Sequence, residues 1–162
     1  DGVTFEANAR IKAIAYAGAT GRVSLADDSG LEVDALGGEP GVRSARWSGV
    51  EGEREVRDAA NNRKLVESLR AVPEADRAAR FVCAMCLAAP DGTVLAETRG
   101  TFDGIVTLEP RGVNGFGYDP DLLLPGEGRT SAELSPAEKN ARSHRGVATR
   151  AMAPLIEALE RS

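Results

Sequence analysis

Residues 112–120 read Gly-Val-Asn-Gly-Phe-Gly-Tyr-Asp-Pro and combine groups that could hold a nucleotide. The glycine density excludes a helix, because each interior glycine costs about 1 kcal/mol relative to alanine. Glycine also lets the backbone approach a ligand closely. Phe116 and Tyr118 offer flat faces on which a base could stack, and Asp119 offers an acceptor or a metal ligand. The alternative is a tight turn with two core aromatic residues.

A second candidate lies where a short predicted strand, Val23–Ala26, runs into Asp27 and Asp28. Adjacent residues of a strand face opposite sides, so we expect one of the two carboxylates to enter a cleft. A carboxylate there could hold Mg²⁺ or accept a proton from water. The hydroxyl of Ser29 and the flexible Gly30 suit a phosphate oxygen. The alternative is a turn with solvated carboxylates.

The third candidate comprises Lys139, His144 and Arg145. A capping box that begins at Ser135 predicts a helix start, and Lys139 then shares a helix face with Ser143. His144 and Arg145 fall at the expected break between two helices, where their N–H donors could read a carbonyl oxygen on a base. The alternatives are a solvated lysine, a helix cap and a surface arginine.

The composition and the missing motifs exclude several kinds of binding partner and reaction. The net charge of −5 argues against general nucleic-acid binding, which needs a basic surface. No apolar run approaches the roughly 18 residues of a membrane span and no signal peptide is visible, so we expect a cytoplasmic protein without a membrane partner. Walker and G-x-S-x-G motifs are absent from the sequence, and it has one histidine. Carboxylate, Mg²⁺ and basic side chains remain, which suits hydrolysis of a phosphoanhydride.

Cys83 and Cys86 have the C-x-x-C spacing of zinc and redox motifs. With one histidine and no second cysteine pair, four soft zinc ligands are lacking. The surrounding segment is continuously apolar and reads as a buried strand, in which residues three apart point to opposite faces. We therefore interpret the two cysteines as inert buried thiols.

Helices alternate with strands and hairpins along the chain, which predicts a single α/β domain over residues 1–162 with a mixed sheet. The expected helices span 4–18, 53–72, a segment from the capping box and a segment after 144. The expected strands span 23–26, 31–36, 81–89, 93–97, 105–108 and 122–124, with a hairpin across 90–92. The apolar stripes are expected to be Ala7, Ile11, Ile14, Ala15 and Gly18 in the first helix, Val56, Ala60, Leu65, Val66 and Leu69 in the second, and Val147, Leu155, Ile156 and Leu159 in the last.

These segments, in this order, resemble the inosine triphosphate pyrophosphatase family, which removes ITP, dITP and XTP. The resemblance covers nearly the whole chain and its motifs are long and specific. The matching residues are Thr4-Phe5, Asn8-Ala9, Ala26 to Leu31, Val33-Asp34, Gly41, Ser44-Ala45-Arg46, Pro110-Arg111-Gly112, Gly115 to Pro120, Thr130, Ala132-Glu133-Leu134, Glu138-Lys139 and Ser143 to Gly146.

The resemblance implies a two-lobed α/β fold around a long mixed β-sheet, a homodimer, and Mg²⁺-dependent cleavage of nucleoside triphosphates to a monophosphate and pyrophosphate. It implies that Asp28 is the general base and a metal ligand. The substrate-binding residues that it implies are Ser29, Phe116, Gly117, Tyr118, Asp119, Lys139, His144 and Arg145, the last two near the purine carbonyl.

In the family a strand and an Asn- and Lys-containing loop that grips the triphosphate precede this region, and a metal-binding Glu is expected just before the position of Asp1. We therefore expect the domain to be N-terminally incomplete. The alternative function is a non-hydrolytic purine nucleotide-binding protein, or a remnant that keeps the dimer surface. A second alternative is a related pyrophosphatase that acts on pyrimidine or modified nucleotides.

Overall fold

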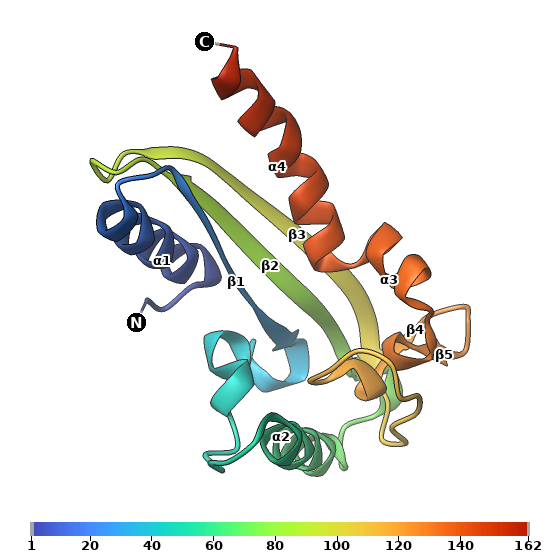
Figure 1. Ribbon diagram of the computed structural model, residues 1–162. Helices are drawn as coiled ribbons and strands as arrows, with labels where there is room; N and C mark the ends of the chain where they lie inside the picture. Colours follow the sequence, from blue (N-terminus) through green and yellow to red (C-terminus); the bar gives the residue numbers. More distant parts are fainter. Residues whose placement is uncertain (1, 162) are drawn as a thin grey trace.

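The computed structural model describes residues 2–161 and shows helices packed on one five-stranded sheet (Figure 1). Asp1, before which the further strand is predicted, lies outside these residues. The strands follow the order β1-β2-β3-β4-β5, and every neighbouring pair is antiparallel. The strands are Ser24–Val33 (β1), Ala78–Ala88 (β2), Val94–Val106 (β3), Leu122–Leu124 (β4) and Arg129–Thr130 (β5). The α/β class is confirmed, but the pairing among these strands is antiparallel rather than mixed.

β1 is one continuous strand, so the prediction of separate strands at 23–26 and 31–36 is wrong. It pairs with β2 along its whole length, from Ser24 opposite Ala88 to Val33 opposite Ala79. Gly30 lies inside this strand without interrupting it. A Cβ at this position would overlap the side chains of Ser44 and Phe5. The glycine thus permits close packing instead of marking a turn. Asp27 and Asp28 consequently lie inside a strand and not at its end.

The hairpin across residues 90–92 is confirmed, and both of its strands are longer than predicted. β3 runs without a break to Val106, so the separate strand predicted at 105–108 is the end of β3. The tight turn includes Gly92 in the left-handed region, with φ +87°. Two long paired strands therefore form a ribbon that reaches across the molecule (Figure 1).

The two faces of the ribbon are covered by different helices. Helix α1 (Phe5–Thr20) packs with Val82, Ala84, Cys86 and Ala88, while helix α4 (His144–Glu160) packs with Cys83, Met85 and Leu87. Because alternate residues of β2 are involved, the two helices lie on opposite faces. Both cysteines are buried, on opposite faces, as predicted. Burial raises the pKa of both thiols.

Helix α2 (Arg54–Leu69) and a short helix, Pro136–Arg142 (α3), lie toward the end of the β2–β3 ribbon that is opposite the turn at residues 90–92 (Figure 1). There a third core cluster joins Leu65 and Leu69 of α2 to Phe81, Phe102 and the β4 region. The apolar clusters thus occupy two regions of the molecule, one around α1 and α4 and one around α2.

Helix ends were predicted better than helix faces. The Thr4 side chain accepts a hydrogen bond from the Ala7 N–H (3.1 Å), and Gly21 ends α1 in the left-handed conformation, as expected. The predicted apolar stripes of α1 and α4 are largely wrong, and Val56 of α2 is exposed. The buried residues are Phe5, Ala9, Ala13 and Ala17 in α1, and Ala148 and Met152 in α4, whereas Ile11, Val147, Leu155 and Leu159 are exposed. The alanines of α1 let that helix approach the sheet closely, whereas the close approach of α4 depends on Gly100 of β3, where a Cβ would overlap the His144 carbonyl.

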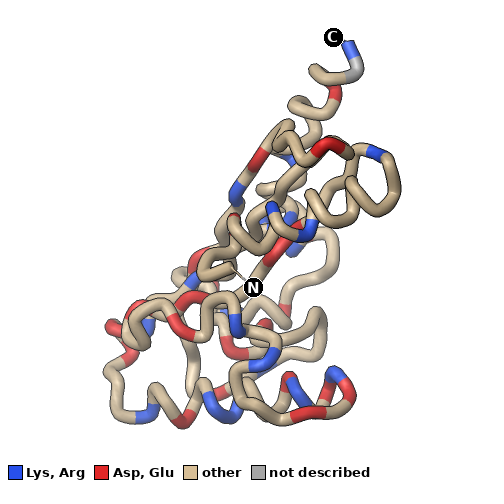
Figure 2. The backbone as a smooth tube through the Cα atoms, turned by 90° about the vertical axis from the view of Figure 1, so that its left-hand side faces the viewer, with Lys and Arg blue, Asp and Glu red and all other residues tan. Residues whose placement is uncertain are grey.

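Basic and acidic residues are interspersed along the backbone (Figure 2). Among the described residues, no helix has the length and apolar character that a membrane span requires.

Candidate functional site

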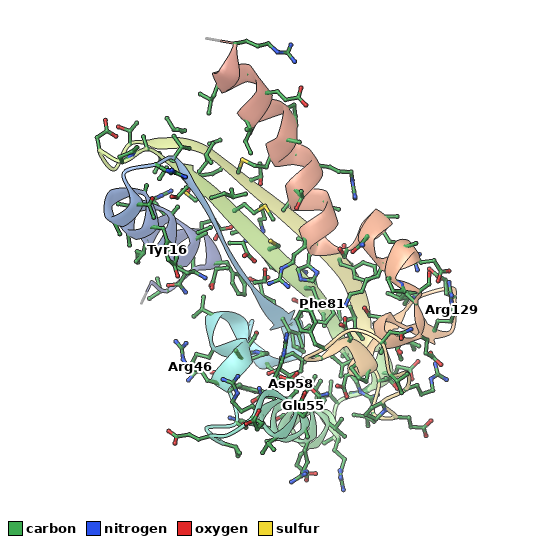
Figure 3. All side chains as sticks on the ribbon, in the orientation of Figure 1. Tyr16, Arg46, Glu55, Asp58, Phe81 and Arg129 are labelled. Atoms are coloured by element: carbon green, nitrogen blue, oxygen red, sulfur yellow. The ribbon has the colours of Figure 1, made fainter. Side chains whose placement is uncertain are left out.

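A cavity of about 380 Å³ lies among β1, α2, the 116–119 loop and the start of α4. Its volume falls within the range of small-molecule sites. Figure 3 shows Phe81 on β2 and Asp58 on α2, two of its lining residues. The lining comprises Ser29, Gly30, Ser44, Ala45, Arg54, Arg57, Asp58, Phe81, Phe116, Gly117, Tyr118, Asp119, Lys139, His144 and Arg145. Eight of the nine predicted site residues are therefore brought together, and Asp28 does not line this cavity.

Asp119 organises the loop from its buried position. One carboxylate oxygen accepts a hydrogen bond from the Ser131 hydroxyl (2.7 Å), and the other accepts from the Phe116 N–H (2.9 Å) and from Lys139 Nζ. A Cβ at Gly115 would overlap this carboxylate, and Gly115 has φ +75°. The glycine density read from the sequence therefore serves a close approach of backbone to Asp119. Asp119 holds the loop and the Lys139 ammonium in place.

The two aromatic residues of the loop have different environments. Phe116 is 46 % exposed, so its ring is available to a ligand, whereas Tyr118 is 5 % exposed and belongs to the core cluster. The Tyr118 hydroxyl donates to the Ser44 carbonyl at 2.8 Å, and burial raises its pKa. The Phe116 ring is therefore open to a stacking ligand, whereas Tyr118, which also lines the cavity, is fixed through its hydroxyl. Stacking of a base on either ring stays a prediction.

Three cations surround the Phe116 ring. The Arg54 guanidinium lies 4.2 Å from the ring centre, Lys139 Nζ lies at 5.3 Å and the Arg145 guanidinium lies at 5.6 Å. Such distances are within the range of cation–π attraction. A ligand that stacks on this ring would lie close to these positive charges, which favours an anionic or carbonyl-rich aromatic group.

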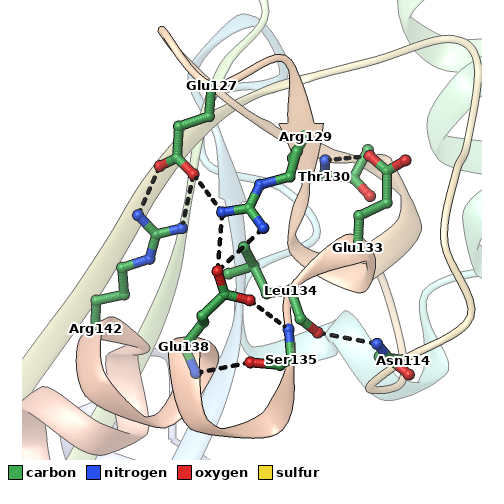
Figure 4. A network of polar contacts seen from close by, with 9 residues as sticks. All are labelled: Asn114, Glu127, Arg129, Thr130, Glu133, Leu134, Ser135, Glu138 and Arg142. Carbon is green, nitrogen blue, oxygen red and sulfur yellow. Dashed lines mark hydrogen bonds and ion pairs between the residues drawn. The ribbon is translucent and has the colours of Figure 1, made fainter.

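Helix α3, which carries Lys139, is held by a network of charged side chains (Figure 4). The Ser135 hydroxyl and the Glu138 carboxylate form the predicted capping box at its start. Arg129 lies between Glu127 and Glu138, with contacts of 3.0 and 3.1 Å, and Arg142 binds Glu127 at 2.6 Å. The two arginines lower the pKa of Glu127 to about 2. These contacts fasten α3 to the turn between β4 and β5.

His144 and Arg145 begin α4, at the predicted helix break. The His144 ring stacks on Phe81 with 5.1 Å between ring centres. Burial, together with the charges of Arg145 and Lys139, lowers the pKa of His144 to about 4. The imidazole is therefore neutral at pH 7, and its buried Nδ1 has no hydrogen-bond partner among the described residues. An unpartnered buried nitrogen beside a cavity is a group that a ligand could satisfy.

Asp27 and Asp28 point to opposite faces of β1, as strand alternation predicts. Asp27 Oδ2 accepts hydrogen bonds from the Ser29 hydroxyl (3.1 Å) and from Arg145 (3.2 Å) on the cavity side. Asp28 faces α1, where Lys12 Nζ lies 2.7 Å from Oδ1 and the Asn8 amide donates to Oδ2 at 3.1 Å. The predicted role of Asp28 as base and metal ligand stays a prediction.

The predicted Mg²⁺ ion has one predicted protein ligand, the Asp28 carboxylate. Among the described residues, no three His, Cys, Asp or Glu side chains gather as a metal cluster. Mg²⁺ is commonly bound through one or two carboxylates together with substrate phosphates and water. A single carboxylate such as that of Asp28 could hold Mg²⁺ only together with phosphate oxygens and water, and the Mg²⁺ ion stays a prediction.

Sequence reasoning missed the contributions of α2 and β2. Arg54, Arg57 and Asp58 line the cavity from α2, and Phe81 lines it from β2. The polar residues of α2 look like an ordinary solvated helix face, because nothing in their local sequence tells which loop they meet. Their spacing of three or four residues was the available signal.

The fold and the site define an α/β protein with a cation-lined cavity suited to an anionic ligand that carries an aromatic ring. The chain belongs to the Ham1 family, whose model matches residues 1–155.

Similar proteins include the dITP/XTP pyrophosphatase of Frankia alni, 54 % identical over 156 residues, which cover 96 % of this chain and 77 % of that protein. The dITP/XTP pyrophosphatase of Mycobacterium tuberculosis is 54 % identical over 158 residues, covering 98 % of this chain and 73 % of the relative. Among solved structures, a HAM1 protein from Coxiella burnetii has a TM-score of 0.88 and 42 % identity, over 97 % of this chain and 78 % of that one. A nucleoside-triphosphatase / dITP/XTP pyrophosphatase from Mycobacterium abscessus has a TM-score of 0.80 and 47 % identity, over 96 % and 77 % of the two chains.

Proposed function

We propose that this protein hydrolyses nonstandard purine nucleoside triphosphates (ITP, dITP and XTP) to the monophosphate and pyrophosphate in a Mg²⁺-dependent reaction that cleanses the nucleotide pool. The observation that carries the proposal is the convergence of Ser29, the Phe116–Asp119 loop, Lys139, His144 and Arg145 on one cavity. The relatives named dITP/XTP pyrophosphatase support it. They favour an enzyme over a non-hydrolytic nucleotide-binding protein.

Base selection follows from the donors around the cavity. Hypoxanthine and xanthine carry a carbonyl oxygen where adenine carries an amino group. The Arg145 guanidinium can only donate hydrogen bonds, and neutral His144 keeps one N–H. Adenine would place its own donor against the Arg145 guanidinium, which leaves polar groups unpaired at a cost of about 1–3 kcal/mol. Phe116 supplies the ring against which the purine stacks.

In this proposal Asp28 accepts the proton of the attacking water, and Asn8 and Lys12 orient its carboxylate. Ser29 contacts the substrate from the cavity side of β1, the face opposite Asp28. Lys139 neutralises developing negative charge from α3, where Asp119 fixes its position. Mg²⁺ bound by Asp28 and the phosphates would supply further charge neutralisation.

A homodimer and a cytoplasmic location are expected from the family resemblance and the composition. A related pyrophosphatase with pyrimidine or modified nucleotide substrates is the remaining alternative among enzymes.

The test is pyrophosphate release from ITP, XTP, dITP, GTP, ATP and dTTP with Mg²⁺, comparing the wild type with Asp28→Asn and Asp27→Asn. We expect hydrolysis of ITP and XTP by the wild type and a loss of roughly 10²-fold or more in Asp28→Asn, since an amide cannot act as a base. Asp27→Asn is the matched variant on the opposite face of the same strand. If Asp27→Asn is inactive and Asp28→Asn retains more than about a tenth of the rate, the base has been assigned to the wrong residue.

A further inference from the structure

Three polar residues of α2, Arg54, Asp58 and Asn62, are spaced by four and therefore lie on one side of the helix. We call them the α2 polar row. All three contact the short segment Phe116–Gly117. A solvated helix face would not concentrate its contacts on two residues of a distant loop.

The α2 polar row holds both backbone groups of Gly117. Asp58 Oδ2 accepts a hydrogen bond from the Gly117 N–H at 2.9 Å, and Asn62 Nδ2 donates to the Gly117 carbonyl at 3.0 Å. Gly117 has φ +61°, a conformation that glycine adopts without a Cβ penalty. Since glycine is conformationally free, the two side chains on either side of it set the orientation of the loop at this point.

The same row contacts the Phe116 ring. The Arg54 guanidinium lies 4.2 Å from the ring centre, and Arg54 Nε lies 3.8 Å from Asp58 Oδ2. The core does not fix the ring, because Phe116 is 46 % exposed and lines both the main cavity and a neighbouring one of about 320 Å³. Its orientation therefore depends on the loop backbone and on the cations around it.

We propose that the α2 polar row positions Phe116 for stacking on the base of a bound nucleotide, and so controls nucleotide affinity and not the chemical step. The identity of the ligand rests on the proposed function. Asp58 and Asn62 are positioning residues, because they act through Gly117. Substitutions that remove the contacts of the α2 polar row with Gly117 should raise KM for ITP and leave kcat near its wild-type value.

The experiment compares Asp58→Ala and Asn62→Ala with two reference variants. Asp58→Asn retains an oxygen that can accept from the Gly117 N–H, so it should restore wild-type behaviour. Arg63→Ala alters an exposed α2 residue next to Asn62 that does not line the main cavity. Two readouts are taken: amide exchange of Gly117 by NMR in the ligand-free protein, and KM and kcat for ITP.

We expect faster Gly117 exchange and a KM raised about tenfold in Asp58→Ala, as for one lost hydrogen bond. Asn62→Ala should raise KM in the same direction, while Asp58→Asn and Arg63→Ala stay at wild-type values. Unchanged Gly117 exchange and KM in Asp58→Ala, or a fall in kcat at constant KM, would overturn the inference. Should Asp58→Ala fail to fold, Asn62→Ala decides through its KM and kcat. A wild type that cleaves no nucleotide contradicts the proposed function, and the Gly117 exchange rate still decides the positioning role.

Discussion

Asp121 provides a test of the structure that does not depend on the function. It follows the ligand-facing loop, is 1 % exposed, and neither carboxylate oxygen has a hydrogen-bond partner among the described residues. Burial raises its pKa from 3.8 to about 7. The folded protein therefore holds a proton on Asp121 at pH values where the unfolded chain has released it.

The sign of the effect on stability follows from this difference. A raised folded pKa contributes stability that is complete below about pH 4 and is lost as the pH rises through about 7. At about 1.4 kcal/mol per pKa unit, the contribution is on the order of 4 kcal/mol. The lowered pKa of His144 gives the opposite slope between about pH 4 and 6.5. A variant that alters only Asp121 leaves the His144 contribution in place, so the difference between the two proteins isolates Asp121.

Asp121→Asn is the informative change, because asparagine has nearly the same shape and does not titrate in this range. Both proteins are unfolded with urea from pH 4 to pH 8. As the pH rises, the free energy of unfolding of the wild type should fall relative to that of the variant. The variant should be about as stable as the wild type at pH 4, because the protonated carboxyl and the amide are both neutral and both buried without partners. At pH 8 it should be the more stable protein by up to about 4 kcal/mol, because only the wild type carries a buried charge there. Two curves that run parallel over the whole range would show that Asp121 does not ionise there, and would refute the reasoning.

Two further predictions concern α4. Arg145→Ala should lower kcat/KM for ITP and XTP by one to two orders of magnitude more than for ATP or dTTP, because it removes about 1–3 kcal/mol of base-specific hydrogen bonding; an equal loss with every nucleotide would assign Arg145 to phosphate or structure. Gly100→Ala should destabilise the protein by about 1–3 kcal/mol in thermal or urea unfolding, because its Cβ would overlap the His144 carbonyl and the Ala148 nitrogen. The matched Gly18→Ala, whose Cβ meets nothing nearer than 3.9 Å within a helix, should be neutral or stabilising by up to about 1 kcal/mol, and equal effects of the two changes would contradict the packing argument.

Features set by neighbouring residues were predictable from the sequence. The Thr4 cap, the Ser135 capping box and the helix break before His144 all appear where local chemistry placed them. Each depends on side chains bonding to backbone within a few residues, so no knowledge of the tertiary fold is needed. The three segments that carry the candidate site residues could likewise be recognised from their local sequence.

Features set by distant contacts were not predictable. The buried face of α1 consists of alanines and Phe5, because the helix lies close to β1 and β2, and Ile11 is left exposed. Likewise, Gly30 reads as a turn residue in sequence, yet it is the point in β1 where Ser44 and Phe5 need room. In both cases the size of a side chain was decided by its partner across the interface and not by its neighbours in the chain.

The site depends on neighbouring residues in the sequence and on distant contacts. For this reason the loop could be identified from the sequence, whereas the α2 residues that hold it could not. The glycines of residues 115–117 stand out in sequence because the backbone must pass close to Asp119 and adopt positive φ. The residues that orient this backbone, Asp58 and Asn62, are ordinary helix surface residues until the fold brings α2 beside the loop. A flexible loop can recognise a ligand only when something else fixes its conformation, because ordering it upon binding would cost affinity. The sequence motif therefore marks where the ligand is expected, and the α2 contacts account for how the motif is kept ready to bind it.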